Sequence, residues 1–410
     1  MSDGTSRSTR EIVVVGGGIG GLTTALALAR DGRPVRVLER ADRFAEVGAG
    51  LQLAPNATGV LRRLGVLDAV LEVGVAPARI VIADARTGEG LVSADLGERF
   101  IRTFGAPYLV VHRGDLLDVL VQAARAAGVE LENGKEVLRT ETAGGETRVV
   151  CSDGSEYAAR AVIGADGLRS NLRQAIHGSS EPVASGYVAY RGALPIEQVE
   201  RPHDLDTVIA WVGPGLHLVQ YPIRRGDLYN QVAVFQSPSF ATGNPDWGGP
   251  DELDAAFANM CPAVRVALPS LQRNFRWPTF DREPVETWVD GRTALLGDAA
   301  HAMLQYLAQG ACQAIEDAAT LAQQFARHDP APAHRGSDGD SDGGVDRALA
   351  AYQQIRAPRT ARVQRSARVW GDVWHIDGTG ALLRNELFRG ITDDDYSYAD
   401  WLWGWEPPAN

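Results

Sequence analysis

Three glycines near the start of the chain have a spacing that can bind a dinucleotide. Gly16, Gly18 and Gly21 form the pattern G-x-G-x-x-G directly after four β-branched residues, and a carboxylate, Glu39, follows 18 residues after the last glycine. In a βαβ unit these glycines permit a tight turn, close approach of the backbone to a pyrophosphate, and packing of helix on strand. The carboxylate can accept hydrogen bonds from a ribose diol. The order of strand, glycines, helix, strand and acid therefore predicts a nucleotide site, which extends to Arg40.

Two later segments also run from an apolar strand into a turn that contains an aspartate. Asp166-Gly167 follows one short apolar run, and Gly297-Asp298 follows another. A long dinucleotide needs contacts at both of its ends, so three separated strand-to-turn segments are a stronger signal than one glycine pattern. An aspartate in such a turn can also cap a helix, and without the other two segments that interpretation of Asp298 would be favoured.

The composition limits the class of protein. The chain has 410 residues, a formal net charge of −12 and 45% hydrophobic residues, which is ordinary for a globular enzyme and gives no basic patch for nucleic acid. Its three cysteines are far apart in sequence, so neither a disulfide framework nor a zinc site is predicted, and a reducing cytoplasm is expected. No transmembrane helix or signal peptide is predicted.

The three nucleotide-type segments resemble the class A flavoprotein aromatic monooxygenases, the para-hydroxybenzoate hydroxylase-like family. This resemblance implies that Glu39 holds the adenosine ribose of FAD, that Arg113 lies beside the cofactor, and that Asp298 bonds the ribityl chain. Asp166 and its glycine would border both FAD and the path of the pyridine nucleotide. A helix beginning at Gly310 can point its positive end at the flavin. The residues assigned to FAD are Gly16, Gly18, Gly21, Glu39, Arg40, Gly50, Arg113, Asp166, Gly167, Gly297, Asp298 and Gly310.

Within the family, the resemblance is greatest to the 3-hydroxybenzoate 6-hydroxylases, with the salicylate hydroxylases as near relatives. It implies hydroxylation of a phenolic aromatic acid with NAD(P)H and O2, through a flavin C4a-hydroperoxide, to a gentisate-type product. Salicylate or another hydroxy- or amino-aromatic acid is the alternative substrate. No second dinucleotide fingerprint follows, so NADH or NADPH is expected to bind transiently, with NADH favoured by the resemblance. The segments that carry this resemblance are residues 48–52, 185–192, 217–222, 304–308 and 401–404.

The candidate catalytic residues are His217, Gln305 and Tyr221. His217 and Tyr221 lie on one face of a predicted strand because they are four residues apart. A neutral histidine can draw the proton from a phenol as charge flows into the ring. Gln305 would orient the phenol oxygen, and Tyr221 would bound the pocket. His301 is expected to hold its loop, and His375 has no comparable sequence context.

The predicted fold is α/β, with a Rossmann-type FAD-binding domain, a second, mostly antiparallel β-sheet domain for the substrate, and a C-terminal helical segment. The helix near residues 347–374 is expected to be interrupted at Pro358. The predicted divisions are a discontinuous FAD-binding domain (1–77, 108–182 and 290–330), a substrate domain (78–107 and 183–289), a mobile loop (331–345), and a C-terminal helix with an aromatic tail (346–410).

Other functions are less compatible with the sequence. A flavin-dependent halogenase needs a lysine in its substrate tunnel, whereas Lys135, the only lysine of the chain, lies in a turn-like stretch. A flavoprotein without enzymatic activity remains an alternative that substrate-stimulated NAD(P)H oxidation would exclude. No metal site is expected, because no predicted helix or strand offers two or three ligands at coordinating spacing. The aromatic tail favours a homodimer if it packs between subunits.

Overall fold

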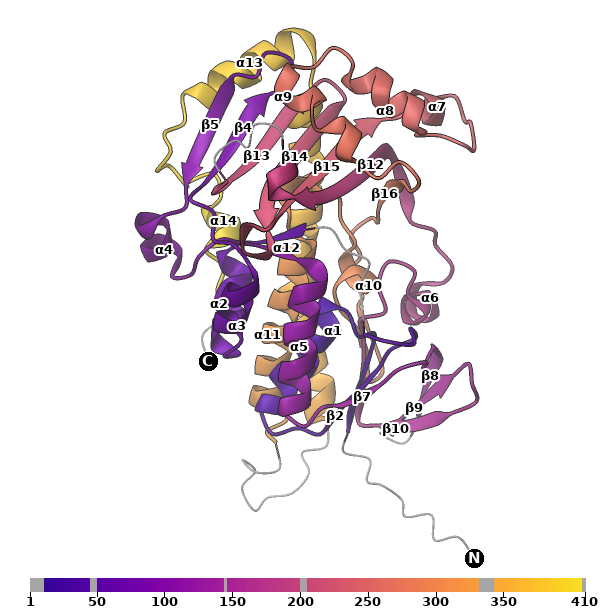
Figure 1. Ribbon diagram of the computed structural model, residues 1–410. Helices are drawn as coiled ribbons and strands as arrows, with labels where there is room; N and C mark the ends of the chain where they lie inside the picture. The colour runs from indigo at the N-terminus through magenta and orange to yellow at the C-terminus, as the bar shows by residue number, and fades with distance from the viewer. Residues whose placement is uncertain (1–10, 45–49, 144–145, 200–204, 332–342, 408–410) are drawn as a thin grey trace, which may run out of the picture.

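Two large β-sheets, one mostly parallel and one mostly antiparallel, form the frame of the molecule (Figure 1). The computed structural model describes residues 11–44, 50–143, 146–199, 205–331 and 343–407. The predicted α/β class, with a second antiparallel sheet and a C-terminal helical segment, is confirmed. Most of the predicted loop 331–345 lies outside the described residues.

The first sheet carries the glycine-rich turn. All four residues of β1 (Ile12–Val15) are buried between parallel neighbours, which explains why this strand is apolar without alternation. Helix α1 (Ile19–Arg30) follows and packs against α5 (Arg113–Ala126) and α11 (Gly310–His328). In spatial order the strands are β17 (Val289–Asp290), β18 (Thr293–Leu295), β11 (Ala161–Gly164), β1 (Ile12–Val15), β2 (Val35–Leu38) and β7 (Glu130–Glu132).

The second sheet has a core on each face. Ile209 and Trp211 of one strand pack with Phe257, whereas their neighbours Ala210 and Val212 pack on the opposite face with aromatic residues of the C-terminal helices. This alternation follows from the period of two in a β-strand. Its strands are β16 (Trp277–Asp281), β12 (Val183–Pro195), β15 (Leu228–Gln236), β14 (Leu216–Ile223), β13 (Thr207–Gly213), β4 (Arg79–Asp84) and β5 (Gly90–Asp95), antiparallel except for the parallel pair β13–β4.

A long helix, α12 (Gly344–His375), passes both sheets and continues through Pro358, so the predicted interruption is wrong. Proline removes one backbone donor and normally kinks a helix. Here buried ion pairs fix the helix to α11 on both sides of the proline, because Arg356 and Arg359 both bind Glu316. These contacts hold the helical path where the local backbone preference is against it.

The remaining elements connect or cover the sheets. Helices α13 (Gly378–Arg389) and α14 (Asp400–Trp403) follow α12. No helix among the described residues is long and apolar enough to cross a membrane, and these residues contain no cluster of potential metal ligands. The other elements are β3 (Gly50–Leu53), β6 (Leu109–His112), β8 (Val137–Ala143), β9 (Glu146–Cys151), β10 (Glu156–Ala159), α2 (Pro55–Arg63), α3 (Leu67–Val73), α4 (Glu98–Phe104), α6 (Asn171–His177), α7 (Pro238–Ala241), α8 (Pro250–Phe257), α9 (Pro262–Arg265) and α10 (Asp298–His301).

Candidate active site

A groove of about 510 Å³ lies where strands β1, β11 and β18 end. The strands are parallel neighbours, so the turns that follow them meet at one edge of the sheet. The three motifs that are far apart in sequence therefore line one groove. Their residues on its wall include Gly16, Gly18, Gly21, Glu39, Arg40, Arg113, Asp166, Gly167, Gly297, Asp298 and Gly310.

The glycines of the first turn have no room for a side chain. Gly16 has φ of +104°, and a Cβ atom there would lie 2.3 Å from the carbonyl oxygen of Ala165. A Cβ atom on Gly21 would lie 2.0 Å from the carbonyl oxygen of Gly16. The turn thus packs backbone against backbone and leaves the start of α1 open to the groove, as a pyrophosphate site requires.

Two carboxylates in the groove can accept further hydrogen bonds from a ligand. Glu39 accepts hydrogen bonds from the backbone N–H groups of Gly17 at 2.6 Å and Ala41 at 2.8 Å, and a carboxylate offers about four acceptor positions. Oδ1 of Asp166 is buried and has no hydrogen-bond partner within the described part of the chain, and burial raises the pKa of this carboxyl. An unpaired buried polar atom of this kind fits a hydroxyl or amide group of a bound nucleotide.

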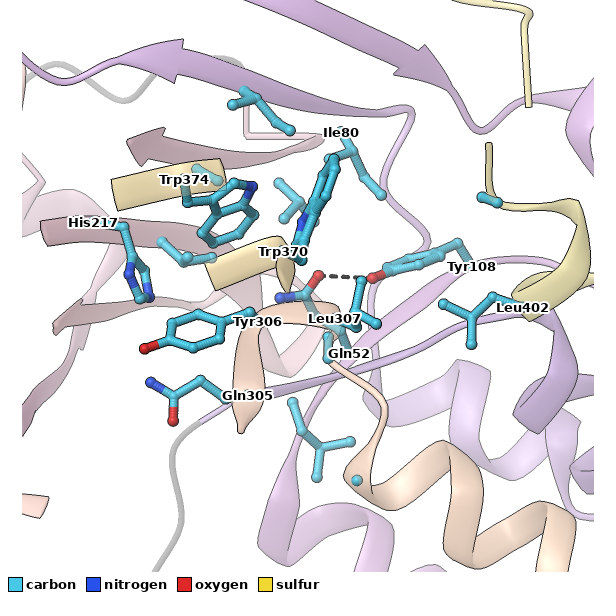
Figure 2. Close-up of a pocket in the computed structure, with 18 of the residues that line it drawn as sticks. Gln52, Ile80, Tyr108, His217, Gln305, Tyr306, Leu307, Trp370, Trp374 and Leu402 are labelled. Carbon is cyan, nitrogen blue, oxygen red and sulfur yellow. Dashed lines mark hydrogen bonds between the residues drawn. The ribbon is translucent and has the colours of Figure 1, made fainter. Parts of the chain in front are cut away.

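A second, apolar cavity of about 660 Å³ adjoins the groove (Figure 2). Figure 2 shows His217, Trp374, Tyr306 and Gln305 on one side and Tyr108 and Leu402 on the other, with Trp370 between the two groups. The Tyr108 hydroxyl donates to Oε1 of Gln52 at 2.7 Å and fixes the far wall. The residues that line both the groove and the cavity are Arg113, Arg191, Gln305, Gly310 and Ala311.

His217 of β14 is buried in the wall of this cavity, together with Tyr221 of the same strand face. Its Nδ1 lies 2.9 Å from Nε2 of His375 at the end of α12, a contact that the sequence context of His375 does not indicate. Burial lowers the pKa of His217 well below its usual value, and it lowers the pKa of His375 to about 4, with a smaller effect from Arg384. Both rings are therefore neutral at neutral pH.

The polar groups around the cavity are few and partly unpaired. Nε2 of Gln305, Nε of Arg191 and Nε1 of Trp374 are buried without hydrogen-bond partners among the described residues. Burial also lowers the pKa of the Arg191 guanidinium, which stacks over the Trp277 ring at 5.3 Å. The cavity thus combines apolar walls with a small number of directed donors, which is typical of a site for a polar aromatic molecule.

The other predicted residues lie in different surroundings. Gly50 lines the aromatic cavity, not the nucleotide groove, and a Cβ atom there would meet the Tyr221 ring at 2.5 Å. His301 is buried and lies 2.6 Å from Asp317, a structural contact beneath the loop. Lys135 pairs with Asp153 at 2.6 Å and does not line the aromatic cavity, which counts against a halogenase.

Several cavity residues were missed by the sequence analysis. Trp370 and Trp374 lie one turn apart on the same face of α12, and this i, i+4 spacing of tryptophans was the available signal. The aromatic tail also contributes. Trp403 packs against Phe100 and Tyr108 of its own chain, so this tail gives no support for a contact between subunits.

A groove for a nucleotide that opens onto an aromatic cavity defines a flavin-dependent hydroxylase, and the comparisons agree. The chain belongs to the FAD binding domain family, whose model matches residues 9–367. It is an FAD-dependent monooxygenase, and the groove fits the cofactor through its side-chain-free glycines and the unpaired Asp166 oxygen.

Three curated relatives match nearly the whole chain. The 3-hydroxybenzoate 6-hydroxylase of Klebsiella oxytoca is 38% identical over 96% of both chains. The 3-hydroxybenzoate 6-hydroxylase 1 of Aquipseudomonas alcaligenes is 39% identical over 96% of this chain and 98% of its own. The 3-amino-4-hydroxybenzoate 2-monooxygenase of Streptomyces cremeus is 36% identical over 96% of this chain and 94% of its own.

Two solved structures share the fold. Klebsiella pneumoniae HpxO complexed with FAD and uric acid has a TM-score of 0.77 and 28% identity, covering 93% of each chain. A salicylate hydroxylase substrate complex has a TM-score of 0.78 and 26% identity, covering 98% of this chain and 97% of the other.

Proposed function

We propose that this enzyme hydroxylates 3-hydroxybenzoate at the position para to its phenol, giving a gentisate-type product, with NADH and O2 as co-substrates. The observation that carries the proposal is the position of His217 and Gln305 in the wall of an aromatic cavity, with Gln305 also lining the nucleotide groove. The identity of 38–39% to 3-hydroxybenzoate 6-hydroxylases supports the substrate.

The proposed chemistry of the chain centres on one proton. FAD, held by the groove residues named above, supplies activated oxygen when it is reduced. Neutral His217 accepts the phenol proton, and Gln305 donates from Nε2 to the phenol oxygen and holds it in place. The apolar walls of Tyr306, Trp370 and Trp374 exclude water from the ring.

Arg191 is the proposed partner of the substrate carboxylate. Its guanidinium lines both the groove and the cavity, its Nε is buried, and among the described residues the charges that act on it are those of Tyr221 and Arg113 and not of a carboxylate. A buried cation without an opposite charge is costly, and a bound carboxylate would offset that cost. Arg191→Gln is expected to raise the Kd of 3-hydroxybenzoate at least tenfold while binding of the uncharged 3-hydroxybenzyl alcohol changes little. Equal weakening of both ligands would contradict this role.

The domain division, the assembly and the location follow as proposals. We assign residues 1–77, 108–182 and 290–330 to the FAD-binding domain and residues 78–107 and 183–289 to the substrate domain. The strands of the two large sheets support this division, except that Val289 of β17 belongs to the first sheet. A homodimer is supported by three exposed leucines on α13. A cytoplasmic location is supported by three buried cysteines that form no disulfide. The leucines are Leu382, Leu383 and Leu387.

The decisive experiment is a panel of hydroxybenzoates with product identification. The purified enzyme with FAD is mixed with NADH or NADPH and each aromatic acid, and the products are separated by chromatography. We expect the highest yield of product per NADH with 3-hydroxybenzoate. A second candidate is an amino-hydroxybenzoate, favoured by the Streptomyces cremeus relative, and a higher yield with 3-amino-4-hydroxybenzoate would replace the first assignment. Absence of hydroxylated product from every acid would refute the proposed function.

A further inference from the structure

We infer that His375 is a positioning residue that keeps the proton of His217 on Nδ1 and so leaves Nε2 free to accept a proton from the substrate. The inference rests on the proposed function, because it concerns the residue that receives the phenol proton. It adds a group from the far end of the chain, 158 residues away, to the site.

The His375 ring is held firmly at its position. It stacks on the Tyr187 ring with a centroid distance of 4.7 Å and an angle of 20°, and it meets the edge of Tyr306 at 5.2 Å. The carbonyl oxygen of His375 accepts a hydrogen bond from Gly215 N–H at 3.0 Å, which fixes the end of α12 against the turn that precedes β14. A ring fixed on several sides is suited to orient its neighbour.

The contact between the two histidines can hold only one proton. Nδ1 of His217 and Nε2 of His375 are 2.9 Å apart, so one nitrogen must donate and the other must accept. If His375 donated, the proton of neutral His217 would sit on Nε2, which could then only donate to a ligand. If His217 donates, Nε2 carries the lone pair that a base requires. The proposed chemistry selects the second arrangement.

The charges around the pair favour neutral rings. The guanidinium of Arg384 donates to the backbone carbonyl of Trp374 at 2.7 Å and disfavours a positive charge on His375. A neutral acceptor differs from the carboxylate that orients histidine in many hydrolases, because it fixes the tautomer without adding a negative charge. His217 thus remains a weak base that readily returns its proton. Tyr187 and Tyr306 contact the pair, and the charge of Asp372 acts on both of these tyrosines.

The proton step balances within these residues. The phenol O–H bond breaks, a bond forms between that proton and Nε2 of His217, and the oxygen keeps the electron pair. The proton on Nδ1 stays bonded to His217 and hydrogen-bonded to Nε2 of His375, so a phenolate and an imidazolium result. The hydrogen bond strengthens as the imidazolium forms, because its donor becomes charged.

The test compares His375→Phe, which keeps an aromatic ring but has no acceptor, with His375→Gln, which restores an acceptor. His328→Gln, at the other end of α11 from the cavity, is the matched control. Hydroxylation of 3-hydroxybenzoate by His375→Phe is expected to fall about tenfold in kcat with FAD content retained, and His375→Gln is expected to recover most of that loss. The ¹⁵N chemical shifts of labelled histidines provide an independent readout: Nδ1 of His217 should be protonated in the native enzyme, and this preference should be lost in His375→Phe.

The outcomes separate this inference from the proposed function. Native enzyme that hydroxylates 3-hydroxybenzoate while His375→Phe retains full kcat would refute the role of His375 and leave the function intact. A native His217 protonated on Nε2 would refute it in the same way. If the native enzyme hydroxylates no acid in the panel, the proposed function itself fails. If His375 is purely structural, His375→Phe and His375→Gln should lower thermal stability equally, and His375→Gln should not recover kcat; that result would also refute the positioning role.

Discussion

The substitution His217→Asn tests the roles of the two ring nitrogens of the proposed base separately. The asparagine amide ends about where Nδ1 of histidine lies, so it can still donate to Nε2 of His375, and nothing replaces Nε2. His217 is buried and burial holds its pKa well below the usual value, so the ring is neutral at pH 7. The variant therefore removes the proposed base at Nε2 while keeping the neighbouring contact.

The size of the effect follows from the role. General base catalysis contributes about 10²- to 10⁴-fold to a rate. The rate of hydroxylation should therefore fall by this factor, which corresponds to a rise of about 3–5 kcal/mol in the activation free energy. FAD content and substrate-stimulated NADH oxidation should persist, because Arg113, Arg191 and the groove are unchanged. The electrons of NADH should then appear in hydrogen peroxide.

The assay measures NADH consumed, aromatic product and peroxide in the same reaction. His217→Ala provides a comparison in which the contact with His375 is also lost and the cavity is enlarged. A product yield per NADH in His217→Asn equal to that of the native enzyme would refute the assignment of His217 as the base.

Three further outcomes are expected. Glu39→Ala should weaken FAD retention about tenfold or more, since it removes charge-assisted hydrogen bonds, and unchanged flavin occupancy after dialysis would contradict the ribose assignment. Arg356→Met leaves Glu316 and Asp317 buried with less compensation and should lower the free energy of unfolding by about 3–5 kcal/mol in a urea titration. His375 has a folded pKa of about 4, below its usual value, so its contribution to stability is complete above pH 6.5 and is lost as the pH falls through 4. The free energy of unfolding should accordingly fall less steeply with decreasing pH in His375→Phe than in the native enzyme. Identical slopes in the two proteins would count against the lowered pKa of His375.

The nucleotide groove could be predicted because its signals are local. Each of the three motifs carries its strand, turn and glycine or aspartate within a few residues, and parallel pairing of β1, β11 and β18 then brings the turns to one edge. The faces of β14 were predictable for the same reason, since alternation places His217 and Tyr221 together.

The remaining features depend on contacts between distant segments. The pairing of His217 with His375 is set by where α12 ends against β14, which no local pattern encodes. The predicted interruption of α12 at Pro358 is wrong because the ion pairs to α11 outweigh the local preference of the proline. Ion pairs of this kind depend on the placement of two whole helices.

The late position of the cavity wall in the chain has a consequence for biosynthesis. All six strands of the first sheet are complete by Leu295, and the aromatic cavity also needs residues translated later, namely Trp370, Trp374, Trp401 and Trp403. A growing polypeptide would hence complete the strands that end at the nucleotide groove before it could enclose an aromatic ring.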